Sequence, residues 1–351
     1  MPVMVDENPL ADKLLNGHQL ARSNVIPTAP RGRQAVLTVG LVNNMPDSGL
    51  ESTEHQFLTL MDEAAADCVV HVKRFSIDSI PRSERGRQHL RAYYSDIREL
   101  WSGRLDGLIV TGTEPRAANL ADEPYWTSLT ALFDWAQENT TSTIFSCLAA
   151  HAAVLHLDGI KRIPLPEKRF GVFQHQKRSD HILLKGAPAW MATPHSRWNE
   201  LPGDALASSG YSILTASPEA GIEMFTRQKK NLFVFFQGHP EYEADTLWRE
   251  YRRDVGRFLR GEQSRYPGLP SGYFSQATIH LLQDFRLRAE AQQREHLLSE
   301  FPATQVPGGV AATWRVQAIR SYRNWFTYIG QHRERMKNRH FAALWPACAA
   351  P

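Results

Sequence analysis

The residues best suited to covalent chemistry are a cysteine and a histidine that each follow an apolar run. Cys147 closes the segment Thr143-Ile-Phe-Ser-Cys147 and precedes an alanine-rich stretch, which predicts a strand that turns directly into a helix. A thiol there projects from the carboxyl edge of a sheet, beside the backbone N–H of Leu148 and the positive end of the helix. Both features favour the thiolate. An arbitrary cysteine is more often buried and structural, so its role depends on its partners.

Those partners are His239 and Glu241, which lie two residues apart just after the apolar run Leu232 to Phe236. In extended backbone, side chains at this spacing share one face, so Glu241 can orient the His239 ring and stabilise its cation. Taken alone, such a pair is more typical of a loop with a solvated carboxylate. Together with Cys147 it predicts a Cys-His-Glu triad, in which the histidine takes up the thiol proton.

Composition excludes several classes of function. The 351 residues are 42% hydrophobic and 22% charged, with a net charge of +3, and nothing in this balance indicates a nucleic-acid partner. Cys68, Cys147 and Cys348 lie far apart without a CxxC pair, which predicts no metal site and no disulfide framework. We expect a cytoplasmic protein with no signal peptide and no membrane span, because the longest strongly apolar run is only Leu232 to Phe236.

The order of elements predicts an α/β fold with a mostly parallel sheet and helices on both faces. Apolar strands are expected after Ala35, at Val69 to Phe75, at Leu105 to Val110, before Cys147 and at Leu232 to Phe236. Helices are expected between them at 51–65, 88–101, 125–138 and 244–260, and short antiparallel strands and loops, including 171–175 and 181–184, at 159–231. The loops after Val42, Val110, Phe145 and Phe236 should then gather at one sheet edge, where α/β proteins bind ligands.

The chain divides into four expected parts. Residues 1–34 should form an irregular N-terminal arm, and residues 35–262 the catalytic domain. Residues 263–335 should form a C-terminal helical extension that packs on this domain, with helices at 276–298 and 314–332. Residues 336–351 form a basic tail without a clear pattern.

The motifs resemble class I glutamine amidotransferases in general, and more closely the homoserine O-succinyltransferase and O-acetyltransferase family. The resemblance runs from about Val36 to Asp254 and resumes weakly at 312–331. The segments that carry it are Asn44-Met-Pro46, Glu54-His-Gln-Phe57, Asp106 to Gly112, Ser146-Cys147-Leu148, Glu167-Lys168, Gly171-Val172, Pro194-His-Ser-Arg197, Gly238-His-Pro-Glu-Tyr242, Thr246-Leu247 and Arg253-Asp254. The resemblance implies the class I glutamine amidotransferase-like, flavodoxin-like form of the α/β fold.

The resemblance also implies an activity and its residues. Cys147 would take an acyl group from acyl-CoA as a thioester, and His239, held by Glu241, would deprotonate the hydroxyl of the acceptor. Lys168, Ser196 and Arg253 would bind the acceptor amino acid. Arg253 suits an α-carboxylate, and Glu250, three residues earlier on the same helical face, could hold this arginine or meet the acceptor's ammonium group.

The chain departs from the family pattern around the reacting carbonyl. Asp47-Ser48-Gly49 stands where the family has a pair of lysines, so the oxyanion would rest on the N–H groups of Leu148 and of Gly112 or Thr113. Arg116 occupies the position linked to acyl-donor choice, where a cation could pair with a succinyl carboxylate or mark a different donor. Leu148 replaces the usual tryptophan, and the helix at 276–298 has no family counterpart.

Two other functions stay open at this point. A glutamine amidotransferase or hydrolase would use the same triad, but no ammonia-consuming domain is visible. A non-catalytic binding homologue is the third alternative, which the intact triad positions disfavour. We therefore expect an acyltransferase that uses succinyl-CoA, or else acetyl-CoA, with homoserine, serine or a related amino acid as the acceptor. A homodimer, no bound cofactor and, if the acceptor is homoserine, a role in methionine biosynthesis are implied by the resemblance.

Overall fold

An eight-stranded sheet forms the centre of the molecule. The computed structural model describes residues 3–5, 36–65, 68–302 and 312–344, with side chains to Arg333. The strand order is β1-β3-β2-β4-β5-β12-β11-β8, and all neighbours as far as β12 are parallel, whereas β11 and β8 are antiparallel. The strands are β1 (Val3–Val5), β2 (Val36–Val42), β3 (Val69–Phe75), β4 (Leu105–Val110), β5 (Thr140–Ser146), β8 (Ser212–Ile213), β11 (Met224–Gln228) and β12 (Leu232–Phe236). The predicted α/β fold with a mostly parallel sheet is confirmed.

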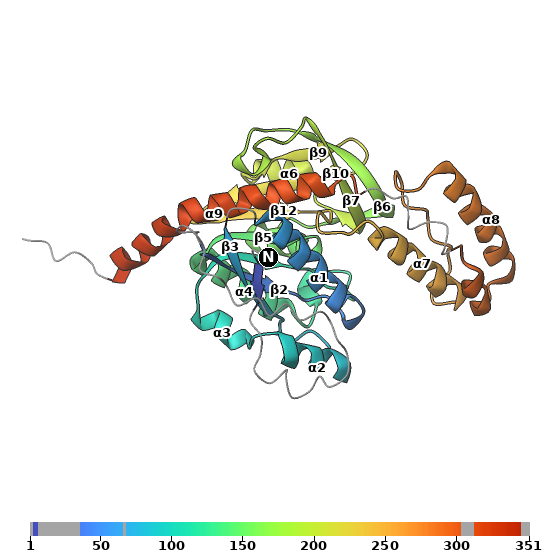
Figure 1. The fold of residues 1–351 in the computed structure, drawn as a ribbon, viewed down its shortest axis with the longest axis horizontal. Coiled ribbons are helices and arrows are strands. Elements are labelled where there is room, and N and C mark those ends of the chain that lie inside the picture. The colour runs from blue at the N-terminus through green and yellow to red at the C-terminus, as the bar shows by residue number, and fades with distance from the viewer. Residues whose placement is uncertain (1–2, 6–35, 66–67, 303–311, 345–351) are drawn as a thin grey trace, which may run out of the picture.

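Helices cover both faces of this sheet (Figure 1). One face packs against α4 (Trp126–Asn139) and α5 (Leu148–Asp158), and the other packs against α1 (Asp47–Ala64) and α9 (Arg315–Leu344). The central strands are therefore buried on both sides, as their continuous apolar sequences predict. The shorter helices are α2 (Glu84–Tyr93), α3 (Ile97–Ser102) and α6 (Gly203–Ser208).

The register of the central strands brings the predicted loops to one edge. Val42 of β2 pairs with Val110 of β4, Val110 pairs with Phe145 of β5, and Ser146 pairs with Phe236 of β12. These four strands thus end at nearly the same height. The loops that follow them meet at the carboxyl edge of the sheet, as expected from the sequence.

A second, four-stranded sheet stands beside the first. Its order is β10-β9-β6-β7, with antiparallel pairing throughout, and its strands are β6 (Ile163–Lys177), β7 (Trp190–Glu200), β9 (Thr215–Ser217) and β10 (Gly221–Ile222). Antiparallel strands were expected here, but β6 and β7 are longer than predicted. The expected strand at 181–184 is instead a 3₁₀ turn, η3 (Ile182–Leu184), because the His181 side chain accepts a hydrogen bond from Leu183 N–H and caps the turn.

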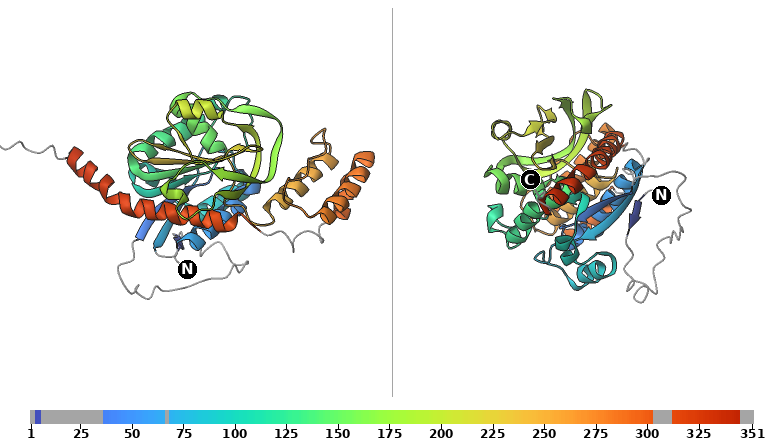
Figure 2. Two further views of the ribbon diagram at one scale, coloured as in Figure 1. Left: turned by 90° about the horizontal axis from the view of Figure 1, so that it is seen from above. Right: turned by 90° about the vertical axis from the view of Figure 1, so that its left-hand side faces the viewer.

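The C-terminal third consists of helices. α7 (Thr246–Leu259), α8 (Gln276–Gln292) and η4 (Glu295–Glu300) share one apolar cluster and project together to one side of the body (Figures 1 and 2). α9 then returns across the sheet. The extension thus contributes both the projecting α8 and, through α9, a large part of the sheet's cover.

Several local predictions were wrong in detail. The helix expected at 88–101 is two helices, because Tyr94 adopts extended backbone and the Asp96 side chain caps a new helix at Arg98 N–H. Within the arm expected to be irregular, Val3–Val5 forms a strand parallel to β3, and residues 6–34 lie outside the described part of the chain. The expected tail begins inside α9, which continues to Leu344, and residues 345–351 are not described.

α9 is attached to the sheet by Trp325. Its indole N–H donates a hydrogen bond of 2.9 Å to Ser142 Oγ of β5, and its side chain is 1% exposed. A Cβ at Gly107 of β4 would lie 2.8 Å from Ile329 and 2.9 Å from Trp325, so the helix rests directly on the strand backbone.

We expect Trp325→Ala to destabilise the protein by about 3–5 kcal/mol, because it removes a buried aromatic side chain and leaves the Ser142 hydroxyl without its donor. The midpoint of urea unfolding measures the loss. Val316→Ala is the matched control, since Val316 lies on the same helix and is 61% exposed. Equal midpoints for the two variants would show that α9 is not held by this contact.

Candidate active site

Cys147 lies at the junction of β5 and α5. Its φ of 50° and ψ of −109° fall in a region that residues with a Cβ rarely adopt, and the Cys147 N–H donates a hydrogen bond of 2.8 Å to Phe236 O of β12. Such backbone strain is retained where the surroundings over-determine it, and it is typical of nucleophile turns. The side chain is partly exposed at the sheet edge, as predicted for a strand-to-helix turn.

Two candidate oxyanion donors lie next to this turn. Leu148 opens α5, so its N–H has no acceptor within the helix. A Cβ built at Gly112 would lie 2.5 Å from Leu148 Cβ and 3.1 Å from Leu148 N, a contact that only glycine permits. A cavity of about 10 Å³ adjoins Gly112, Thr113 and Leu148. The structure thus brings together the three residues that the sequence proposed for the oxyanion.

His239 and Glu241 lie beside the cysteine. His239 Nδ1 is 2.8 Å from Glu241 Oε1, and the His239 N–H donates to Pro194 O at 2.8 Å, so both ring and backbone are held. Burial by itself would lower the pKa of His239, but the charges of Cys147 and Glu241, and hydrogen bonds to both, raise it well above its ordinary value. Because Glu241 engages Nδ1, the other ring nitrogen is available to Cys147. The predicted triad is therefore assembled in space.

Two arginines also interact with this thiol: Arg162, which was not predicted from the sequence, and Arg197, which was quoted only as part of a motif. Burial lowers the pKa of Arg162 and of Arg197, while the charge of Cys147 opposes that effect at both. Both guanidinium groups therefore lie close enough to Cys147 to interact with it electrostatically. Arg197 is buried and committed, since it donates to Asn199 O and Ala220 O and, at 3.2 Å, to His195 Nδ1. Arg162 is only half-buried.

Asp47, which stands where the family has lysine, holds its own loop. Its Oδ2 accepts a hydrogen bond of 2.7 Å from Ser83 N–H, and Arg82 Nη1 lies 3.4 Å from its Oδ1. Although burial alone would raise the pKa of Asp47, these hydrogen bonds and the Arg82 charge lower it. The Asp47 carboxylate is thus occupied by its contacts with Ser83 and Arg82.

The four predicted acceptor-binding residues form one cluster. Lys168 Nζ lies 3.0 Å from Asp254 Oδ2 and 3.6 Å from Glu250 Oε2, and it sits 4.1 Å from the centre of the Phe170 ring. The Ser196 hydroxyl donates to Glu250 Oε2, and Arg253 Nε donates to Asp254 Oδ1 at 2.9 Å. Asp254, which was quoted only as part of a motif, is therefore a central member. The cluster contains two cations and two carboxylates.

Tyr242 joins this cluster to the triad. Its ring stacks on His239 with 4.3 Å between ring centres and 15° between planes, and its hydroxyl donates to Glu250 Oε1. It was noted in the sequence only as the last residue of a motif.

Arg116 lies in the loop after β4 with an exposed side chain. Its backbone N–H and that of Ala117 both donate to Glu123 Oε1, at 2.5 and 2.6 Å, and Glu123 follows the short 3₁₀ turn η2 (Leu120–Asp122). Glu123 thereby fixes the loop that carries Arg116. No contact places the Arg116 guanidinium against the thiol in the described part of the molecule.

A buried polar cluster stands behind the triad. His195 Nε2 lies 3.2 Å from both His175 Nε2 and Glu223 Oε2, a spacing that a metal ion could bridge. However, Arg197 Nε donates to His195 Nδ1, so the single proton of a neutral His195 must sit on Nε2, which then has no lone pair for a metal. We interpret the cluster as a chain of hydrogen bonds.

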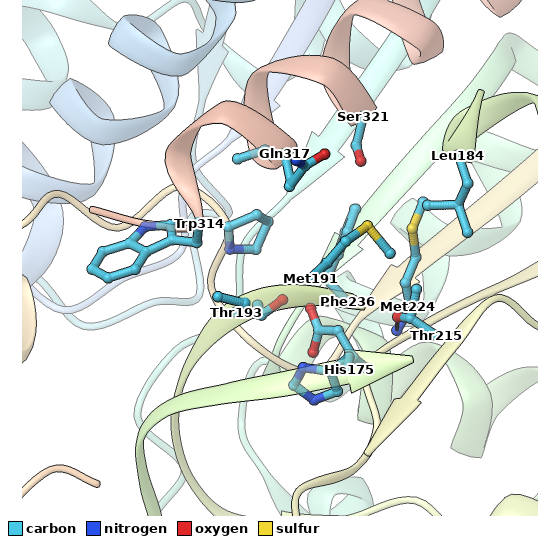
Figure 3. A pocket seen from close by; sticks show the side chains of 14 residues that line it. His175, Leu184, Met191, Thr193, Thr215, Met224, Phe236, Trp314, Gln317 and Ser321 are labelled. Carbon is cyan, nitrogen blue, oxygen red and sulfur yellow. Dashed lines mark hydrogen bonds between the residues drawn. The ribbon is translucent and has the colours of Figure 1, made fainter. Parts of the chain in front are cut away.

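This chain adjoins a cavity of about 30 Å³ that reaches under α9 (Figure 3). Gln317 and Ser321 of α9 face His175 and Thr193 across it. Its volume suits about two water molecules, which would supply hydrogen bonds to Glu223 Oε1, an atom without a partner among the described residues. Pro240 lines this cavity, Cys147 does not, and the volume is too small for a substrate.

Comparisons with known proteins agree on one family. A family model described as homoserine O-succinyltransferase matches residues 2–335. A homoserine O-succinyltransferase from Rhodopseudomonas palustris is 48% identical over 290 residues, which cover 83% of this chain and 87% of the relative. One from Methylorubrum extorquens is 45% identical over 300 residues, covering 86% and 89% respectively.

Among solved structures, a glutamine amidotransferase from Methylobacillus flagellatus matches with a TM-score of 0.44 and 15% identity over 84% of this chain and 95% of that chain. Among the described helices, none combines the length and the apolar character that a membrane crossing needs.

We expect the pKa of His239 to fall when either Cys147 or Glu241 is replaced. Each of these neighbours raises the pKa, and without one of them the opposite effect of burial is less fully offset. Cys147→Ala and Glu241→Gln should each show this in a pH titration of histidine ring resonances in isotope-labelled protein. His151 is an internal reference, since burial lowers its pKa to about 3, and Cys68→Ala is the matched cysteine control. An unchanged His239 titration in both site variants would contradict the assigned electrostatics.

Proposed function

This chain belongs to the homoserine O-succinyltransferase family, and we propose that it transfers a succinyl group from succinyl-CoA, through a thioester on Cys147, to the hydroxyl of homoserine. It is accordingly an acyltransferase. The observation that carries the proposed route is the contact of the Cys147–His239–Glu241 group, through Tyr242, with a cluster suited to an amino acid. We also propose the cytoplasm as its compartment, and the homodimer implied by the resemblance stays a prediction.

In the first half-reaction, the Cys147 thiolate attacks the carbonyl carbon of the acyl-CoA thioester. The oxyanion that forms accepts hydrogen bonds from the N–H groups of Leu148 and of Gly112 or Thr113. The bond to the CoA sulfur then breaks, and the departing thiolate takes the proton carried by His239. The raised pKa of His239 fits this step, because the ring starts as imidazolium.

In the second half-reaction, neutral His239 removes the proton from the hydroxyl of the acceptor as its oxygen attacks the Cys147 thioester. The same donors hold the second oxyanion. The carbon–sulfur bond then breaks, which leaves the O-acyl amino acid, the Cys147 thiolate and a protonated His239. The enzyme thus returns to its starting charge state without any other reactant.

The acceptor amino acid is proposed to bind in the ion cluster formed by residues of β6, β7 and α7. Its carboxylate would pair with Lys168 and Arg253, and its ammonium group with Glu250 and Asp254. Ser196 keeps Glu250 in place by donating to its Oε2. Homoserine is favoured because the relatives carry that name, while serine and threonine are the alternatives that a discharge assay separates.

The succinyl carboxylate needs a cation near the thioester, and two arginines are candidates. Arg116 occupies the position linked to donor choice and is exposed. Arg162 is half-buried, and the charge of Cys147 acts on it. A short methylene spacer separates the succinyl carbonyl from its carboxylate, so Arg162 is the better placed of the two.

We expect intact-mass spectrometry to show a succinyl adduct after incubation with succinyl-CoA, and none in Cys147→Ala. Homoserine should discharge the adduct faster than serine or threonine does. Arg162→Gln should slow adduct formation from succinyl-CoA by roughly ten- to a hundredfold and slow the reaction with acetyl-CoA far less, because only succinyl carries a second charge. Arg116→Gln is measured beside it, because Arg116 is the other candidate partner of the succinyl carboxylate.

Three outcomes would contradict the proposal. If neither CoA ester formed an adduct and glutamine released ammonia, the protein would be a glutaminase. The absence of all three reactions would identify a non-catalytic homologue. An acetyl adduct without a succinyl adduct would show that the donor is acetyl-CoA and not succinyl-CoA.

A further inference from the structure

Tyr242 lies between the base and the acceptor cluster and contacts both. Its side chain is buried, its N–H donates to His239 O at 3.2 Å, and its carbonyl accepts from Trp314 Nε1 at 2.8 Å. The backbone of Tyr242 is therefore held at both its N–H and its carbonyl group. Because it lies nearly parallel to the imidazole, it fixes the plane of the His239 ring from the side that Glu241 does not reach.

The stacked contact also stabilises the charged form of the base. An aromatic face attracts a cation, and an imidazolium 4.3 Å from the tyrosine ring centre lies within the range of that interaction. Glu241 fixes the rotation of the ring by bonding Nδ1, and Tyr242 fixes its tilt.

Glu250 divides its two oxygens between the acceptor cluster and Tyr242. Oε2 accepts from Ser196 and faces Lys168, and Oε1 accepts from the Tyr242 hydroxyl. An ammonium group that binds Glu250 therefore acts on the same carboxylate that holds Tyr242. Acceptor binding and the position of the Tyr242 ring therefore both depend on the Glu250 carboxylate.

We infer that Tyr242 is a positioning residue that couples acceptor binding at Glu250 to the orientation of His239. This inference rests on the proposed function. It assigns the Tyr242 hydroxyl to the second half-reaction, in which acceptor and base must meet. In the first half-reaction no acceptor is bound. Glu241 and the aromatic ring of Tyr242 are then sufficient to orient His239.

Tyr242→Phe is the decisive variant, because it removes the hydroxyl and keeps the stacked ring. We expect adduct formation from succinyl-CoA within about twofold of wild type, and discharge by saturating homoserine slowed roughly ten- to a hundredfold, the effect of losing one hydrogen bond to a charged group. Rapid-quench mass spectrometry measures the two half-reactions separately. Tyr242→Leu removes ring and hydroxyl together and should slow both.

Tyr211→Phe is the matched control. Tyr211 is a buried tyrosine that contacts the Phe225 ring, and its hydroxyl donates to Asp158 Oδ2 at 2.6 Å, at the opposite end of α5 from Cys147. Removing this hydroxyl should therefore leave both half-reactions unchanged. A second readout is the pH profile of discharge, whose midpoint should shift in Tyr242→Phe and stay fixed in Tyr211→Phe.

The inference is overturned if Tyr242→Phe slows both half-reactions equally, or slows neither. A failure of the proposed function is distinct from these outcomes, because the wild type would then form no adduct from succinyl-CoA at all. Misfolding of Tyr242→Leu would not affect the result, since Tyr242→Phe retains the ring that fills the core.

Discussion

The parallel pairing of β5 with β12 is the constraint on which the active site depends. Ser146 pairs with Phe236 at the carboxyl end of both strands, and the Cys147 N–H donates to Phe236 O immediately beyond that pair. A shift of one residue in this register would turn every side chain of a strand to the other face. It would also separate the thiol from the segment that carries His239 and Glu241. The positive φ of Cys147, a strain of about 1–3 kcal/mol, persists because this pairing and the close approach of Gly112 hold both sides of the turn.

Two buried carboxylates near His239 have different electrostatic roles. Glu241 bonds the imidazole directly and helps to keep it charged. Burial raises the pKa of Glu223 to about 8, so this carboxyl carries a proton near neutral pH and adds no second anion beside the base. It still accepts the Gly238 N–H at 2.8 Å and thereby steadies the residue before His239. Arg197 supplies a positive charge that interacts with the thiol. Charge at the site is thus set by burial as much as by the identity of the residues.

The sequence predicted the strand ends well and the three-dimensional neighbours less well. The loops after β2, β4, β5 and β12 were placed correctly, because apolar runs and strand-to-helix turns are local signals. Arg162, Arg197 and Tyr242 were missed as site residues, since their importance comes from contacts with elements far away in the sequence. The break between α2 and α3 was also missed: Asp96 is a good cap, but only the bond from Ser95 N–H to Arg74 O shows that the chain leaves the helix there. Burial and partner choice, which decide pKa and charge, are properties of the folded chain.

The most direct test of this account is a crystal structure of the protein after reaction with succinyl-CoA in the absence of an acceptor. The account predicts a thioester on Cys147 Sγ, with its carbonyl oxygen within hydrogen-bond distance of the N–H of Leu148 and of Gly112 or Thr113. It also predicts that His239 keeps its contact with Glu241. An acyl group on any other residue, or a thioester whose carbonyl oxygen points away from these donors, would contradict the claim that the β5–β12 edge assembles the reacting groups.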